Sequence, residues 1–169
     1  RLLLPRAMCR ASGVSARWQQ CLPDGIEELW DRVAALPDIA RGERHREFLE
    51  WRFRASPQRE WLVLPVKNRR GNLIAYFVGV RHGDHLRVFD LLLADRDAGV
   101  LPLQALVVAA RELKFDSVRI LFGGCARMHR ALKRAGFQLR DERPCFLIQP
   151  AGAAQLPRQW WLTKAGEGG

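Results

Sequence analysis

Three apolar segments between residues 61 and 93 constrain the fold of this chain more than any other feature. They are Trp61–Val66, Leu73–Val80 and Leu86–Leu93, and only short segments separate them. Asn68–Asn72 and His82–Asp84 contain the asparagine, aspartate and glycine residues that favour tight turns. The sequence therefore predicts an antiparallel meander of three strands.

The residues after the meander alternate between helical and extended patterns. Pro102 suits the first turn of a helix that continues to Leu113, and Val118–Phe122 is typical of a strand. A strand entered from a helix usually runs parallel to the strand before that helix. Ala126–Ala135 is predicted to be another helix, and Gly136 suits its left-handed cap. These patterns predict an α/β fold whose mixed sheet is antiparallel first and parallel afterwards.

Two further helices are predicted before the meander. Ile26–Leu36 follows Asp24, a favourable N-cap residue, and repeats apolar residues at helical spacing. Glu43–Arg54 is the second helix, and it ends before Pro57. The apolar residues of this second helix are Phe48, Trp51 and Phe53.

The two ends of the chain give weaker signals. Residues 1–24 contain several helix breakers and are expected to form a linker or a peripheral helix, whereas residues 25–169 form one domain. Phe146–Ile148 and Trp160–Leu162 are predicted closing strands. Because the sequence begins with arginine, we expect it to be the C-terminal half of a longer protein. Scattered cysteines and the lack of an apolar run of ~20 residues favour a cytoplasmic protein without a membrane span.

The net charge of +10 has two interpretations. The chain contains 28 lysine and arginine residues against 18 acidic ones, and only four of the basic residues are lysines. Such an arginine bias arises in a GC-rich genome without selection for any partner. The alternative is an anionic ligand, such as cofactor phosphates, an acidic glycan or nucleic acid. Because no recognisable reading helix is present, we expect no sequence-specific nucleic-acid binding.

Three segments, together with the order of the predicted elements, carry a resemblance to a known family. Arg130–Phe137 looks like a last-helix motif that ends in Gly-Phe. Val88–Leu93 leads into a helix, as does the central strand of that family, and Phe48–Phe53 precedes the first meander strand. Over about residues 25–163 the chain resembles the GNAT superfamily of acyl-CoA-dependent N-acetyltransferases. It is similar to a bacterial branch, often with tandem domains, that is associated with surface-polysaccharide biosynthesis.

The resemblance implies that two adjacent parallel strands splay apart at their C-terminal ends and hold acyl-CoA in the gap. Acetyl-CoA or another acyl-CoA would be the co-substrate, and no metal is expected. The residues implied to bind it are Leu91, Leu92, Leu93, Arg96, Gly99, Val100, Leu101, Leu103 and Gln104. The chain departs from the family here, because the glycine-rich phosphate signal is missing and Pro102 removes one N–H donor. The other interpretation is a connection that binds nothing.

Asp90 and His129 are the candidate catalytic residues. Asp90 interrupts an apolar strand, so it is either a general base at the splay or a structural partner of a helix arginine. Strand alternation would put Asp90 on the face opposite Phe89 and Leu91. The resemblance implies a tyrosine acid at the position of Leu132. His129, on the same helix, either substitutes for that acid or is a partly exposed surface residue.

The function that the resemblance implies is transfer of an acyl group from acyl-CoA to an amine. The expected acceptor is a small amine or an amino sugar, such as a sugar nucleotide or a cell-envelope precursor. A preceding GNAT-like domain in the same chain is a further expected partner. The alternative is a catalytically degenerate GNAT-like module with a structural or docking role. Leu132 and the absent glycine signal favour this alternative, whereas Asp90 favours the enzyme.

Overall fold

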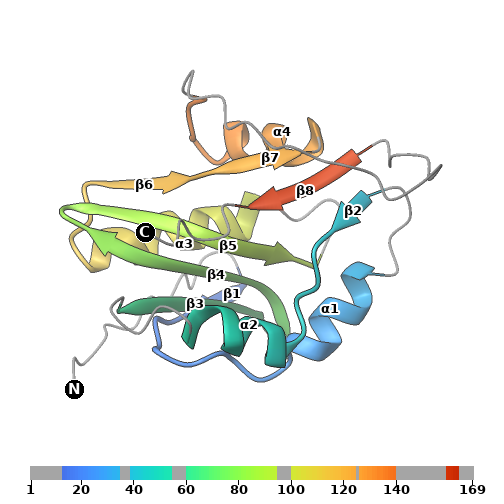
Figure 1. Cartoon of the computed structure of the whole chain (residues 1–169). Helices are drawn as coiled ribbons and strands as arrows, with labels where there is room; N and C mark the ends of the chain where they lie inside the picture. The colour runs from blue at the N-terminus through green and yellow to red at the C-terminus, as the bar shows by residue number, and fades with distance from the viewer. Residues whose placement is uncertain are drawn as a thin grey trace.

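The computed structural model of the chain describes residues 13–34, 39–54, 60–94, 100–124, 126–139 and 159–163. Its helices are α1 (Ile26–Ala34), α2 (Arg46–Arg54), α3 (Val100–Glu112) and α4 (Ala126–Arg134). Its strands are β1 (Val14–Ala16), β2 (Ile39–Arg41), β3 (Trp61–Asn68), β4 (Leu73–His82), β5 (His85–Leu93), β6 (Ser117–Ile120), β7 (Phe122–Gly124) and β8 (Gln159–Thr163). Figure 1 shows the strands in two sheets, the larger of which is twisted and has helices packed against it.

The larger of two sheets has five strands in the order β1-β3-β4-β5-β6. β3, β4 and β5 are antiparallel neighbours, and β5 pairs in parallel with β6 after the crossover through α3. The side chain of Asn68 shapes the first hairpin turn, because its Oδ1 accepts the N–H groups of Arg70 and Asn72 at 2.9 and 3.1 Å. The predicted meander, the parallel fourth strand and the α/β class are confirmed.

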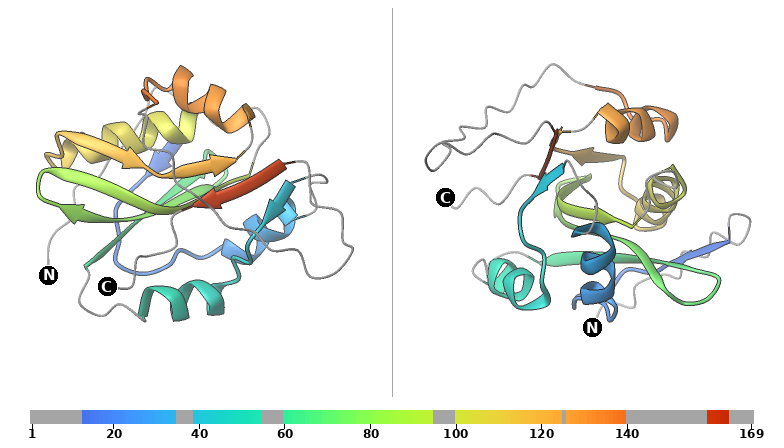
Figure 2. Two further views of the ribbon diagram at one scale, coloured as in Figure 1. Left: turned by 45° about the horizontal axis from the view of Figure 1, so that its top comes forward. Right: turned by 90° about the vertical axis from the view of Figure 1, so that its right-hand side faces the viewer.

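Helices cover both faces of the five-stranded sheet, and each face has its own hydrophobic core (Figure 2). On one face, which we call the α1–α2 face, Leu29 and Leu49 pack against Val78 and Leu92. On the other, the α3–α4 face, the residues packed together include Phe77, Leu91, Leu103, Leu106 and Met128. The strands in between are apolar on both sides, which is why their sequences are almost continuously hydrophobic.

β5 and β6 separate partway along their length. Their parallel pairing runs from His85 and Ser117 to Val88 and Ile120. Beyond this point β5 continues to Leu93 beside β4, whereas the chain after β6 enters β7 and pairs with β8. β7, β8 and β2 form a separate three-stranded sheet in the order β2-β8-β7, which includes the predicted strand at Trp160–Leu162. The other predicted closing strand, Phe146–Ile148, lies outside the described residues.

A β-bulge in β5 coincides with this separation. Val78 is paired with Asp90, but the next residue of β4, Gly79, is paired with Val88, so Phe89 is the extra residue. The Phe89 ring contacts Trp61 on the α1–α2 face, and Asp90 faces the same side. Strand alternation predicted that Asp90 lies on the face opposite Phe89 and Leu91. This is confirmed for Leu91, which is buried on the α3–α4 face, but the bulge makes it wrong for Phe89.

Part of the segment expected to be a linker or a peripheral helix contributes to the sheet. Residues 14–16 form β1, which is antiparallel to β3. Trp18 follows it with only 2% of its surface exposed, and its Nε1 donates to the carbonyl oxygen of Ala109 in α3 at 2.9 Å. The N-terminal part of the described chain is therefore anchored in the α3–α4 core.

The first helix begins at Ile26 as predicted, but the residue directly before it and the start of the second helix differ from the prediction. Gly25, not Asp24, precedes α1, and its carbonyl oxygen accepts the N–H of Leu29 at 3.0 Å. α2 begins at Arg46 rather than at Glu43. Its inward residues are Leu49 and Phe53, one turn apart, whereas Trp51 is 67% exposed because it points away from the sheet.

Candidate functional site

The predicted cofactor site lies where β5 runs past the end of β6 and the chain enters α3. Leu91 and Leu93 are buried on the α3–α4 face, and Leu92 is buried on the α1–α2 face. Of the α3 residues, Leu103 is buried, Val100 is half-buried, and Leu101 and Gln104 are exposed. Arg96 and Gly99 lie outside the described residues.

The start of α3 presents the physical elements of an anion site. The first turn of any helix has N–H groups without intrahelical acceptors, at the positive end of its dipole. α3 begins at Val100, so Pro102 is its third residue. The N–H group that proline lacks would have had no acceptor within the helix, so its loss breaks no intrahelical hydrogen bond. The remaining donors do not depend on side-chain identity.

Asp90 is the centre of a buried polar cluster on the α1–α2 face. It is 1% exposed, and its Oδ1 accepts the Nε and Nη2 hydrogens of Arg44 at 3.2 and 3.1 Å. Its Oδ2 accepts the hydroxyl hydrogen of Tyr76 at 2.9 Å. Arg44 also donates from Nη1 to the carbonyl oxygen of Gly42 at 2.7 Å. This geometry matches the structural alternative for Asp90, although Arg44 comes from the segment before α2 rather than from a helix.

The opposite charges in this buried cluster stabilise one another. Burial opposes the charge of Arg44, but the neighbouring Asp90 and Tyr76 together outweigh burial, so the pKa of the guanidinium is raised. Burial, followed by the neighbouring Asp90 charge, raises the pKa of Tyr76 well above its usual value. The arrangement therefore holds Arg44 charged and Tyr76 protonated.

The ionisation of Tyr76 can be observed directly because it is the only tyrosine of the chain. We expect no phenolate absorbance from the native protein at about pH 10, where an unperturbed tyrosine is half ionised. Its pKa is raised on folding, so this contribution to stability is complete below about pH 10 and is lost as the pH rises towards the folded pKa. A near-ultraviolet pH titration of native and urea-unfolded protein tests this, with Tyr76→Phe as the blank. A native midpoint near the unfolded one would contradict it.

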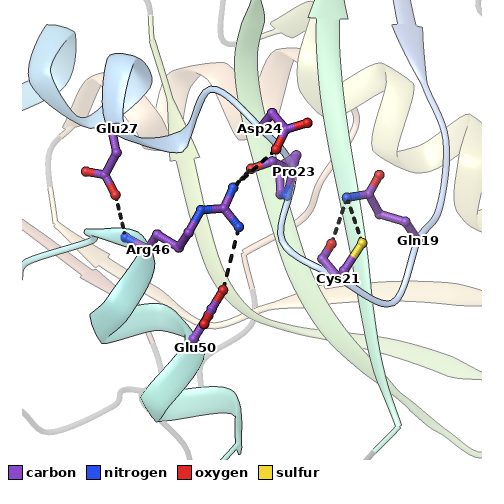
Figure 3. A network of polar contacts seen from close by, with 7 residues as sticks. All are labelled: Gln19, Cys21, Pro23, Asp24, Glu27, Arg46 and Glu50. Atoms are coloured by element: carbon purple, nitrogen blue, oxygen red, sulfur yellow. Dashed lines mark hydrogen bonds and ion pairs between the residues drawn. The ribbon is translucent and has the colours of Figure 1, made fainter.

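A second polar network fixes the start of α2, close in sequence to Arg44 (Figure 3). The backbone N–H of Arg46 donates to Oε1 of Glu27 in α1 at 2.8 Å. The guanidinium of Arg46 contacts the Pro23 carbonyl, Asp24 and Glu50. α1 and α2 are thus joined near the point from which Arg44 reaches Asp90.

Sequence reasoning identified Asp90 but missed both of its partners. Arg44 is separated from Asp90 by 46 residues and Tyr76 by 14, and no local pattern encodes such pairings. The available signal was a lone tyrosine inside an apolar strand, because a buried hydroxyl needs a hydrogen-bond partner.

His129 belongs to a different part of the molecule. It is half-buried on α4, where its ring lies edge-on to Phe122 with 5.6 Å between the centroids. Phe122 is part of the α3–α4 core, whereas Asp90 faces α1 and α2. The structure therefore does not bring the two candidate catalytic residues together.

The helix that carries His129 ends as predicted. Gly136 adopts a φ of +92°, and the N–H of Phe137 donates to the carbonyl oxygen of Leu132 at 3.0 Å. The side chain of Leu132 is half-buried against the α3–α4 core. An apolar residue therefore occupies the position at which the family resemblance implies an acid.

Within the described part of the chain, no group of three or more His, Cys, Asp or Glu side chains is arranged to hold a metal ion. None of the helices described is long and apolar enough to cross a membrane. No family model matches the chain, and no curated protein matches it closely enough to count as a relative.

Proposed function

We propose that this chain is a GNAT-like N-acyltransferase domain that binds acyl-CoA and transfers its acyl group to an amine. The observation that carries the proposal is the separation of β5 from β6 after Val88 and Ile120. Ligands of open α/β sheets bind beyond the C-terminal ends of parallel strands, where neighbouring connections diverge. β5 and β6 have this arrangement, and the helix that follows β5 is α3.

Each part of the proposed donor site has a physical role. The pyrophosphate of CoA would accept hydrogen bonds from the first turn of α3, with Leu101 and Gln104 at its exposed side. The pantetheine arm would lie along the portion of β5 that extends past β6. The amine attacks the thioester carbon, the C–S bond breaks, and the thiol of CoA is released. Binding both reactants at one site would supply proximity, which is a large part of such catalysis.

A charge reversal at the start of α3 tests donor binding. We expect Leu101→Glu to weaken acyl-CoA binding at least tenfold, or about 1.4 kcal/mol, because a carboxylate would face the phosphates. It should not lower the thermal midpoint, since an acidic residue in the first turn complements the helix dipole. Calorimetry with acetyl-CoA and longer acyl-CoAs gives the affinities.

The same substitution at Leu139, which is 88% exposed and lies after α4, is the matched control. It should bind acyl-CoA like the parent protein. If the parent binds no acyl-CoA at millimolar concentration, the acyltransferase proposal fails.

The second candidate function is a GNAT-like module that docks against a partner and does not catalyse. Two observations favour it. The Asp90 carboxylate is engaged by Arg44 and Tyr76, and Leu132 occupies the position of the implied acid. In the acyltransferase proposal we therefore give Asp90 a positioning role. Measured acyl-CoA binding distinguishes the acyltransferase from the docking module, because only the acyltransferase requires it.

A further inference from the structure

Two arginines are neighbours on the same face of the sheet, where β5 and β6 begin to pair. Arg87 of β5 and Arg119 of β6 are register partners. The residues on either side of each arginine pack against the α3–α4 core, so strand alternation turns both arginines to the α1–α2 face. These flanking residues are Leu86, Val88, Val118 and Ile120.

A serine–histidine pair precedes the arginines on the same two strands. His85 and Ser117 are also register partners, and Oγ of Ser117 is 2.9 Å from Nδ1 of His85. Side chains two residues apart in a strand share a face, so this pair lies beside Arg87 and Arg119. We call these four side chains, two from each strand, the β5–β6 patch.

The positive charge of the β5–β6 patch has no counter-ion on the described part of the chain. Neither arginine forms an ion pair there. Asp84 and Asp116, directly before the two strands, are joined through their backbones and form no ion pair with the arginines. Like charges opposite each other on paired strands repel, and a bound anion would remove this repulsion.

The β5–β6 patch can be reached from solution. Arg119 is exposed, and the other three side chains are half-buried. β6 is an edge strand of the five-stranded sheet. On the α1–α2 face, α1 and α2 lie towards β3 and away from β6 (Figure 1). The arginines can therefore extend their guanidinium groups to a ligand while their aliphatic stems rest on the sheet.

The hydrogen-bond donors of the patch suit a phosphate group. Each guanidinium has planar pairs of N–H groups that match two oxygens at once. The serine–histidine pair adds a donor in either neutral tautomer. If the hydroxyl donates to Nδ1, the Nε2–H of His85 remains available. If Nδ1 donates instead, the hydroxyl hydrogen of Ser117 remains available. A phosphate has enough oxygens to accept from all these groups.

We propose that the β5–β6 patch binds a phosphate group, either as the free ion or carried by a small molecule. The patch is at the start of the parallel pairing, whereas the proposed acyl-CoA site lies beyond its end at Val88 and Ile120. It is therefore a second site, and it does not depend on the acyltransferase proposal. It also gives the anionic-ligand interpretation of the net charge of +10 a defined location.

Histidine side-chain NMR tests the proposal, because the chain has only four histidines. The probes are inorganic phosphate and glucose 6-phosphate, with glucose as the uncharged comparison, all at constant ionic strength. We expect both phosphate probes to shift the ring resonances of His85, assigned with His85→Gln. His45, which contacts Glu27, and His129 on α4 are internal references that should not shift. Tighter binding of the sugar phosphate identifies an ester as the ligand, and tighter binding of the ion identifies free phosphate.

Three variants separate a specific site from general attraction to a basic protein. Arg119→Met keeps the aliphatic stem and should weaken phosphate binding at least tenfold through the loss of charge-assisted hydrogen bonds. Its thermal midpoint without phosphate should stay the same or rise, because the repulsion from Arg87 is removed. Arg70→Met, exposed in the turn between β3 and β4, removes the same charge and should bind like the parent. Leu101→Glu, at the start of α3, should also leave phosphate binding unchanged.

Several results would overturn the inference. One is that neither phosphate probe shifts the His85 resonances. Another is equal affinity of Arg119→Met and Arg70→Met, which would show attraction to the net charge alone. A lower midpoint of unliganded Arg119→Met would show that Arg119 serves the fold instead. If Arg119→Met does not fold, Arg87→Met is judged by the same criteria.

Discussion

Replacing Asp90 with asparagine should lower the free energy of unfolding by about 3–5 kcal/mol, because the buried charge of Arg44 would lose its carboxylate. Arg44 is only 5% exposed, so water cannot take over that role. Urea unfolding of the parent and Asp90→Asn, followed by tryptophan fluorescence, measures the loss.

The matched control removes the whole cluster instead of one member. In the triple variant Arg44→Met, Asp90→Leu, Tyr76→Phe no charge or hydroxyl of the cluster remains without a partner. Apolar replacement of a buried ionic group is often neutral or stabilising, so the triple variant should regain at least half of the loss. If the free energy of unfolding of Asp90→Asn is within about 0.5 kcal/mol of the parent value, the charge of Arg44 does not depend on Asp90.

Gly79→Ala should cost about 3 kcal/mol, at the upper end of the penalty for overpacking. A Cβ atom at this position would lie 2.6 Å from the carbonyl oxygen of Arg87 in the neighbouring strand. This oxygen belongs to the backbone beside the bulge, so it cannot move without disturbing the pairing of β4 with β5. Urea unfolding again gives the magnitude.

Gly71→Asn is the comparison for the glycine at the bulge. Gly71 has a φ of +83° in an open turn, where a Cβ atom would meet nothing within 4 Å, and asparagine tolerates this conformation. It should therefore lose much less stability than Gly79→Ala. If the two variants lose the same amount, the cost reflects glycine replacement in general and not the close approach of β5.

The sequence predicted those parts of the fold that local patterns encode. The strands from Trp61 to Leu93 and the helix–strand–helix after them follow from apolar spacing and turn residues. β1 and β2 are three residues long, so each is defined by its partner strand and not by a pattern of its own. Phe48, Trp51 and Phe53 are equally apolar in the sequence, and only the position of Trp51 on the helix explains why it is 67% exposed.

The candidate site was less predictable for a related reason. Asp90 could be found because a carboxylate in an apolar strand demands a partner. The bulge that turns Asp90 and Phe89 to one face depends on how β4 and β5 align, and this alignment includes the close approach at Gly79. Arg44 lies 46 residues from Asp90 in the sequence, and only the folded chain shows that the two side chains pair.

The pairing of β2 with β8 has a consequence for how the chain assembles. Ile39 and Gln159 are neighbours in the folded protein, in parallel register, although most of the chain lies between them. During synthesis β2 emerges before β8 and cannot acquire this partner until the segment between the two strands has been translated. Bringing such distant segments together costs the conformational entropy of closing a long loop. This loss comes late, after the local meander can form. The three-stranded sheet therefore cannot become native until β8 has left the ribosome.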